Sequence, residues 1–370
     1  MKILFFLRWA GVRYGGGETH VIELASRMAN RGHEVHVLTR DGKRVNEFGS
    51  KIKVWCVSKN WKESDHSYVA SDIRLYLHTT FFLIKSFLMM LSLKKRGINY
   101  DIISVHHVTE SFLMRLIRKF FRWSYIFFLD GYTDLEAREA KYADLQLAIS
   151  QTIINKCNAN YGYKPLLGLV GTDVTQFTAK GQRLSFESGQ KVVFTVSRLA
   201  TQKNLHIYIE AAKLVCKKDP NFLFLIGGEG PDKNRLIRLI AEYNLQNKVI
   251  LVGGISQEKL PVYYRSADMF VTTEFPPDET LITVIEALSS GVPVIGTSPT
   301  GRFEVIGESG AIVPFDRPDL LANKILEVSN NPKLRRKMIT QGLERAKLYD
   351  WNRLIKIYEK ACNKVIKSKS

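Results

Sequence analysis

Residues 2–40 read KILFFLRWAGVRYGGGETHVIELASRMANRGHEVHVLTR and contain the pattern that decides the fold. The run from Lys2 to Trp9 is almost continuously apolar, as expected of a strand that is buried on both faces of a sheet. After a glycine-rich loop, apolar residues recur at helical spacing from Val21 to Met28, and Gly32 ends the helix. A second apolar run, residues 34–40, completes a strand–helix–strand unit and therefore predicts a parallel sheet.

The same alternation continues along the chain and predicts two domains. Further strands are expected at residues 52–58, 100–107, 124–131 and 145–150. Hydrophobic periodicity is lost at residues 176–190, where we place the linker. A second series of strands is expected at residues 191–197, 221–228, 248–254, 268–274 and 293–298. The predicted fold class is α/β, with two doubly wound domains at residues 1–178 and 179–350, followed by a C-terminal helix and basic tail at residues 351–370.

The charge of the chain bears on its partners. A net charge of +18 implies an anionic partner, such as nucleic acid, an anionic membrane surface or a phosphorylated ligand. One diphosphate does not require so large a surplus, so most of it serves another purpose or none. The four cysteines are scattered and form no Cys/His cluster, which predicts free thiols in a reducing cytoplasm and no zinc site.

Two apolar stretches resemble targeting or membrane segments. We interpret the N-terminus as a strand rather than a signal peptide, because glycines and Glu18 follow its short apolar run at once. Residues 76–97 are interrupted by Lys85, and the clean run is shorter than the ~20 residues that a spanning helix needs. We therefore expect no transmembrane helix.

Three loops that follow predicted strands are candidates for phosphate binding. Gly15 and Gly16 permit close backbone approach at a helix N-terminus, although a plain turn explains them equally well. Arg198 and Lys203 in SRLATQKN have the residue types that clamp a pyrophosphate, although a solvated basic loop is the alternative. Gly228 in GGEGP permits an unusual backbone turn close to a ligand, which is a weak signal by itself.

The segment FPPDETLITVIEAL, residues 275–288, is more specific. The amides and dipole at the start of its helix, where Glu279, Thr280 and Leu281 lie, favour a phosphate. Glu286, one to two turns further on, would then reach the ribose hydroxyls of the same ligand. Its sequence neighbours are apolar nearly all round, which argues against a solvated surface glutamate.

These segments, in this order, resemble the family 4 glycosyltransferases of the GT-B fold, which are retaining, metal-independent nucleotide-sugar enzymes. Nearly the whole chain takes part, including YADLQLAIS, GTDVTQF, VILVGGIS, SADMFVTTE, IEALSSGVPVIGT and GRFEVI. The resemblance implies two Rossmann-like domains that face a central cleft, with a C-terminal helix that crosses back to pack on the first. It also implies a GDP- or UDP-sugar donor and no cofactor, and the absence of a DxD motif indicates no metal site.

The resemblance also assigns roles to residues. It implies that Gly15 and Gly16 approach the donor, that Arg198 and Lys203 bind its diphosphate, and that Glu286 holds the ribose. The base pocket would be lined through the backbone of Gly253, Gly254 and Ile255.

At two positions the chain departs from the family pattern. The family has a glutamate eight positions before Glu286, where this chain has Asp278; Glu279 would serve after a one-residue loop deletion, but register favours Asp278. A family histidine near the acceptor is replaced by Asp130, which is either a general base or a turn cap. His106 and His107 are further acceptor candidates or structural residues.

The resemblance implies front-face transfer of a hexose to a hydroxyl of a lipid, lipid-linked or glycan acceptor, as in polysaccharide or glycolipid biosynthesis. Residues 74–122 carry more cations than acids, and a membrane-binding surface is expected there on the cytoplasmic face of an anionic membrane. Its apolar members are expected to be Phe81, Phe82, Leu83, Phe87, Leu88, Phe120, Phe121 and Trp123. Core helices with basic rims are the alternative. The rival functions are a UDP-sugar epimerase or hydrolase of similar fold and a basic nucleic-acid-binding protein, although no nucleic-acid motif is present.

Overall fold

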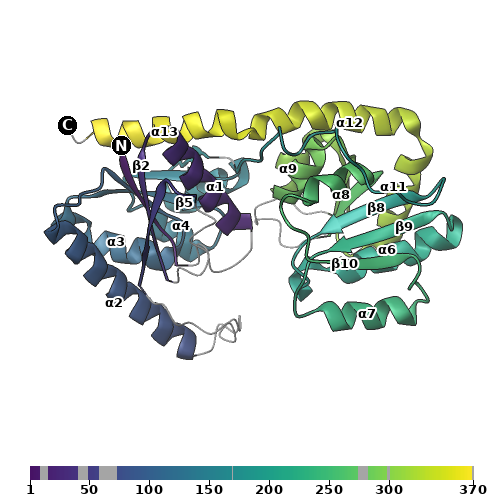
Figure 1. The fold of residues 1–370 in the computed structure, drawn as a ribbon, viewed down its shortest axis with the longest axis horizontal. Helices are drawn as coiled ribbons and strands as arrows, with labels where there is room; N and C mark the ends of the chain where they lie inside the picture. Colours follow the sequence, from purple (N-terminus) through teal and green to yellow (C-terminus); the bar gives the residue numbers. More distant parts are fainter. Residues whose placement is uncertain are drawn as a thin grey trace. The chain divides into compact units, whose positions relative to one another are not determined.

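The computed structural model describes residues 1–8, 16–40, 49–57, 73–168, 170–273, 282–297 and 301–368. The chain divides into two units (Figure 1). The first comprises Met1–Val170 together with Leu354–Ser370, and the second comprises Gly171–Arg353. The segment 176–190, where we expected a linker, packs onto the second unit: Phe177 is buried in its core, and its carbonyl oxygen accepts a hydrogen bond from the Ser289 hydroxyl.

The first unit contains a parallel sheet whose described strands run in the order β3-β2-β1-β4-β5-β6-β7. The strands are β1 Lys2–Phe6, β2 Glu34–Thr39, β3 Ile52–Cys56, β4 Ile102–Val105, β5 Ser124–Leu129, β6 Leu145–Ala148 and β7 Leu166–Leu167. All the pairings are parallel, and β1 lies between β2 and β4. The order reverses beside β1, which confirms the doubly wound topology.

Helices cover both faces of this sheet (Figure 1). They are α1 Gly16–Asn30, α2 Ile73–Lys95, α3 Val108–Phe121, α4 Asp134–Ala140, α5 Gln151–Tyr161 and α13 Trp351–Lys367. Within this unit, α2 and α3 lie on the side opposite α13. The buried strands explain the continuous apolar runs in the sequence, because a strand covered on both faces exposes no polar face.

The C-terminal helix α13 packs on the first unit. The Glu359 carboxylate accepts hydrogen bonds from Arg31 Nε and Nη2 at 2.6 and 2.9 Å, and lies 2.9 Å from His33 Nε2. The Tyr358 ring is buried and stacks on Phe5, with ring centroids 6.2 Å apart. A partly exposed ion pair contributes little, so this apolar packing supplies most of the attachment.

The second unit repeats the architecture, with its described strands in the order β10-β9-β8-β11-β12-β13. The strands are β8 Lys191–Val196, β9 Phe222–Gly227, β10 Val249–Gly253, β11 Met269–Thr272, β12 Val294–Thr297 and β13 Ala311–Val313. Its helices are η3 Thr201–Lys203, α6 Leu205–Lys218, α7 Lys233–Glu242, α8 Leu260–Ser266, α9 Ile282–Ser289, α10 Gly301–Ile306, η4 Gly307–Ser309, α11 Pro318–Asn330, α12 Pro332–Ala346 and η5 Lys347–Tyr349. The order reverses between β8 and β11, so a ligand crevice is expected at the carboxyl ends of these strands.

Candidate functional site

Backbone hydrogen bonds join the three loops that follow β8, β9 and β10. The amide of Ser197 donates to the carbonyl of Gly227 at 3.1 Å, and the amide of Leu199 donates to the carbonyl of Glu229 at 3.0 Å. The amide of Gly228 donates to the carbonyl of Gly253 at 2.7 Å. The carboxyl edge of the sheet is therefore a fixed network rather than three independent turns.

The glycines of GGEGP make this network possible. A Cβ atom on Gly228 would lie 1.9 Å from the carbonyl oxygen of Ser197, and one on Gly230 would lie 2.2 Å from that of Leu199. Gly228 also has a φ of 123°, which residues with side chains rarely adopt. The weak sequence signal of this motif thus corresponds to two close approaches between neighbouring loops.

The expected diphosphate-binding residues lie on the loop after β8. Arg198 is exposed, and Lys203 is half-buried at the end of η3. The carbonyl oxygen of Lys203 accepts a hydrogen bond from the Thr273 hydroxyl at 2.8 Å, which ties the loop to the end of β11. Both cations are therefore carried by a backbone that is held at the carboxyl edge, where a phosphate would be stabilised electrostatically.

The expected base pocket lies at the end of β10. Gly253 has a φ of 76°, and the Glu229 carboxylate lies 3.2 Å from where its Cβ would be. Gly254 is exposed and Ile255 is half-buried, with its side chain over Gly227. These residues are thus adjacent to the loop that contains Gly228.

Glu286 lies on α9, and its burial confirms that this helix has no solvated face there. The side chain is only 3% exposed. The hydroxyl of Tyr264 donates to Glu286 Oε2 at 2.9 Å, and Nε2 of Gln257 donates to Oε1 at 3.4 Å. Burial raises the pKa of Glu286 to about 7, while the two hydrogen bonds oppose the rise by favouring the carboxylate.

Gln257 and Tyr264 were not among the predicted site residues. Neither belongs to a motif, and Tyr264 lies 22 positions from its partner Glu286. The sequence offers no signal for this contact, because it depends on how α8 packs against α9. Gln257 follows Ile255 closely, so it connects the expected base loop to Glu286.

Several predicted donor-site residues cannot be placed. Gly15, Asp278, Glu279, Thr280 and Leu281 lie outside the described residues. Gly16 is the first residue of α1. The roles suggested for these positions remain predictions.

The acceptor candidates of the first unit differ in accessibility. His106 is 1% exposed, and its ring stacks on Phe128 with centroids 5.3 Å apart. Burial holds the pKa of His106 well below its usual range, so this histidine is a neutral core residue. His107, at the N-cap of α3, and Asp130, which follows β5, are partly exposed and remain the acceptor candidates.

Two further features concern metals and cavities. Among the residues that the structure describes, no cluster of three or more His, Cys, Asp or Glu side chains is arranged to hold a metal ion.

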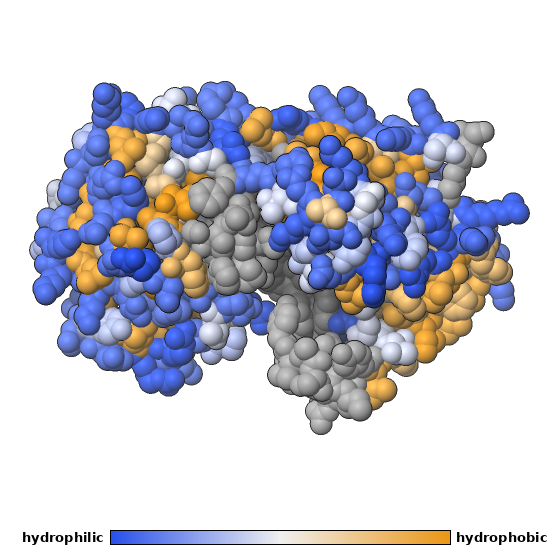
Figure 2. Space-filling view, turned by 180° about the vertical axis from the view of Figure 1, so that it is seen from behind, coloured by the Kyte–Doolittle hydropathy of each residue, from blue (hydrophilic) through white to orange (hydrophobic). Residues whose placement is uncertain are grey.

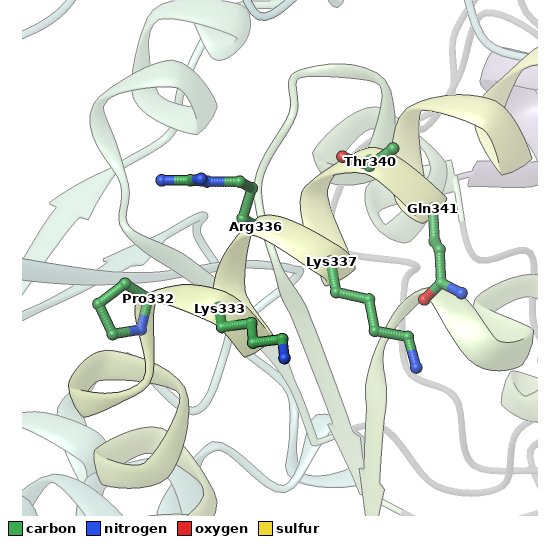
Figure 3. A pocket seen from close by; sticks show the side chains of 6 residues that line it. All are labelled: Pro332, Lys333, Arg336, Lys337, Thr340 and Gln341. Atoms are coloured by element: carbon green, nitrogen blue, oxygen red, sulfur yellow. The ribbon is translucent and has the colours of Figure 1, made fainter.

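A surface hollow of about 480 Å³ lies on α12 (Figure 3). It is lined by Pro332, Lys333, Arg336, Lys337, Thr340 and Gln341. All six lining residues come from α12, and none of them is a residue of the candidate site.

The apolar surface of the first unit differs from the one predicted. Phe82, Phe121 and Trp123 are buried, so they belong to the core and not to a surface. The exposed apolar side chains of α2 and α3, here called the apolar ridge, are 44–67% exposed. They are Leu77, Phe81, Ile84, Leu88, Phe112, Leu116 and Phe120. Figure 2 shows apolar side chains gathered where α2 runs along this unit.

Cations lie beside the apolar ridge. Lys85 Nζ is 4.4 Å from the centre of the Phe81 ring, and the Arg115 guanidinium is 5.0 Å from that of Phe112. Contrary to the expectation based on Lys85, residues Leu77–Lys95 have the length and apolar composition of a membrane-crossing helix. Of the apolar stretch on which this rests, 22% is buried. Length and composition alone are weak evidence for a span, because the core helix of a soluble protein meets the same criteria.

Two family models match the chain. "Glycosyl transferases group 1" matches residues 176–345, and "Glycosyltransferase Family 4" matches residues 14–166. Mannosylfructose-phosphate synthase of Agrobacterium fabrum is 30% identical over 46% of the chain and 39% of its own length. An alpha-monoglucosyldiacylglycerol synthase of Streptococcus pneumoniae is 30% identical over 30% of the chain and 25% of its own length. These matches thus cover less than half of either relative.

Other similarities extend over the full chain. A phosphatidylinositol N-acetylglucosaminyltransferase component of Arabidopsis thaliana is 23% identical over 98% of the chain and 82% of its own length. Sucrose-phosphate synthase of Thermosynechococcus elongatus has a TM-score of 0.81 at 18% identity, with 99% of both chains covered. HepE of Anabaena in complex with UDP-glucose has a TM-score of 0.76 at 18% identity, also with 99% of both chains covered. The likeness to these structures establishes the GT-B fold.

Proposed function

The chain belongs to the glycosyltransferases of group 1 and family 4, and we propose that it moves a hexose from a GDP- or UDP-sugar to a hydroxyl of a lipid, lipid-linked or glycan acceptor. The hydrogen-bonded network of loops after β8, β9 and β10 is the observation that carries this proposal. It holds Arg198 and Lys203 at the carboxyl edge of the second unit. The loop after β10 also carries Gln257, whose side-chain amide contacts Glu286. A solved relative of this fold binds UDP-glucose, which supports a nucleotide-sugar donor.

The proposed transfer is retaining, metal-independent and front-face. Arg198, Lys203 and the start of α9 at Ile282 would stabilise the charge that develops on the leaving diphosphate, which would itself help to deprotonate the acceptor. Glu286 would hold the ribose, and Asp278 or Glu279 would contact the sugar. Alanine variants of these two acids, compared side by side, would distinguish them.

A donor screen tests the proposal. Nucleotide release would be followed from GDP-mannose, UDP-glucose, UDP-galactose and UDP-GlcNAc, with and without a lipid acceptor and with EDTA present. We expect acceptor-dependent release from one donor and thermal stabilisation by its nucleoside diphosphate. Stabilisation by neither GDP nor UDP would contradict a nucleotide-sugar enzyme. Release or isomerisation of the sugar without an acceptor would instead identify a hydrolase or an epimerase.

The apolar ridge supports a peripheral position on an anionic membrane, with a lipid or lipid-linked acceptor. Exposed apolar side chains beside Lys85 and Arg115 provide the two attractions that hold a protein at such an interface. Relatives named for glycolipid synthesis are consistent with this acceptor class.

Replacing four ridge residues with serine should reduce vesicle binding at least ~10-fold, because each side chain contributes roughly 1.5 kcal/mol or more when buried. The residues are Phe81, Leu88, Leu116 and Phe120, all of which are exposed, so the fold should persist. Binding is measured by flotation with anionic vesicles at physiological salt.

The matched control is Ile237→Ser, which removes an exposed apolar side chain from α7 of the other unit. It should bind vesicles as the unmodified protein does. Undiminished binding by the fourfold variant would exclude the ridge, and no binding by the unmodified protein would exclude the membrane.

A further inference from the structure

We propose that Tyr264 and Gln257 prepare Glu286 for the donor: Tyr264 anchors one carboxylate oxygen permanently, while Gln257 occupies the other until the ribose hydroxyls of the nucleotide sugar displace it. Tyr264 is thus a positioning residue, because it acts through Glu286 and not on the substrate. The inference rests on the proposed function and adds how this part of the donor site is held.

The surroundings of Tyr264 make it a fixed anchor. The residue is fully buried, and its ring lies among Phe177, Phe194 and Phe270, with centroids 5.4–5.9 Å away. A ring packed on several sides cannot swing its hydroxyl away without opening the core. The bond of 2.9 Å to Glu286 Oε2 therefore fixes the orientation of the carboxylate.

Gln257 has the opposite character. It is exposed, and its amide lies 3.4 Å from Glu286 Oε1, beyond the usual length of an N–H···O bond. It also lies next to the expected base loop that ends at Ile255. A ribose hydroxyl can replace this weak donor at little cost, because the hydroxyl makes the same type of hydrogen bond to Oε1.

The charge of Glu286 depends on these two donors. Two cations on helices that pack against α9 have other partners: Arg265 of α8 donates to the carbonyls of Gln182 and Thr178, and Arg345 of α12 donates to that of Val305. In the described part of the chain, the bonds from Tyr264 and Gln257 are what favours the ionised form against burial. Loss of the Tyr264 hydroxyl should therefore extend protonation of Glu286 to higher pH.

The test is the pH dependence of donor affinity, measured by calorimetry from pH 5.5 to 9 without acceptor. UDP-glucose and GDP-mannose are the probes, because a bridged diphosphate keeps its charge over this range whereas a terminal phosphate titrates near pH 6. For the unmodified protein, affinity should be constant at high pH and fall about tenfold per pH unit below about pH 7. The pH at which the affinity begins to fall is called the bend. Glu286→Gln should abolish it.

Tyr264→Phe should move the bend upward by about one pH unit and therefore weaken binding about fivefold at pH 7. Gln257→Leu, at an exposed position where folding is not at risk, should move the bend upward by less and leave the affinity at pH 9 within about twofold. A merely structural role of Tyr264 would instead lower the affinity equally at every pH.

The matched control is Tyr208→Phe. The buried Tyr208 hydroxyl donates to the carbonyls of Val193 and Leu225 in the same unit, so its loss costs stability without reaching Glu286, and the bend should not move. A bend that Glu286→Gln removes but that stays in place in both Tyr264→Phe and Gln257→Leu would overturn this inference alone. Failure of the unmodified protein to bind either sugar nucleotide at any pH would overturn the proposed function itself.

Discussion

Glu286→Ala and Lys203→Ala are each expected to lower transferase activity at least ~10-fold, a loss of about 1.4 kcal/mol of transition-state stabilisation. Lys203 is held at the carboxyl edge of the second sheet, where the leaving diphosphate is expected to gain charge. Glu286 is buried with two donors already directed at its carboxylate, so its loss removes an oriented group. Initial rates of nucleotide release measure both effects.

The control for this prediction is a cation of the same unit that lies away from the carboxyl edge. Lys218 is in the last turn of α6, where its Nζ contacts Asn323, so Lys218→Ala should keep the unmodified rate. Thermal denaturation would check that each variant is folded, which matters for Glu286→Ala because it leaves the buried Tyr264 hydroxyl without its acceptor. Near-normal rates in both site variants would refute the candidate site.

The fold was predictable wherever a single strand or helix is long enough to show a hydrophobic pattern. The strand β5 is six residues of continuous burial, and α1 ends before Gly32, which was predicted to stop the helix and has a φ of 88°. The strands β7 and β13 were missed because two or three residues are too few to show any period. Their places are set by pairing with β6 and β12, which is a long-range effect.

The surfaces and contacts of the site were less predictable. In α2, the neighbours Phe81 and Phe82 are 50% and 2% exposed, and a helix that is apolar on most sides does not show which face meets the core. The burial of Glu286 was predictable from its apolar neighbours, but its donors were not, because Tyr264 and Gln257 reach it through tertiary packing. Local patterns therefore identify the elements, and packing between elements selects the partners.

Gly228→Ala is expected to destabilise the second unit by about 2–5 kcal/mol, the sum of an unfavourable backbone conformation and a steric clash. The added Cβ would lie 1.9 Å from the Ser197 carbonyl oxygen, and that backbone cannot yield without disturbing the bond between Ser197 and Gly227. Since Gly228 also donates to Gly253, the loops after β8 and β10 should both move. Chemical denaturation measures the stability, and donor affinity should fall with it.

The matched control separates the clash from the backbone conformation. Gly189 has a φ of 78° and nothing within 4 Å of its expected Cβ, so Gly189→Ala should cost only the conformational part, about 1–2 kcal/mol. Because a φ of 123° is less favourable for alanine than one of 78°, the difference between the two variants is an upper bound on the free energy of the close approach between the loops. If Gly228→Ala were no less stable than Gly189→Ala, the loops would be able to separate freely. They would then not provide the rigid support for Arg198 and Lys203 on which electrostatic stabilisation of a leaving diphosphate depends.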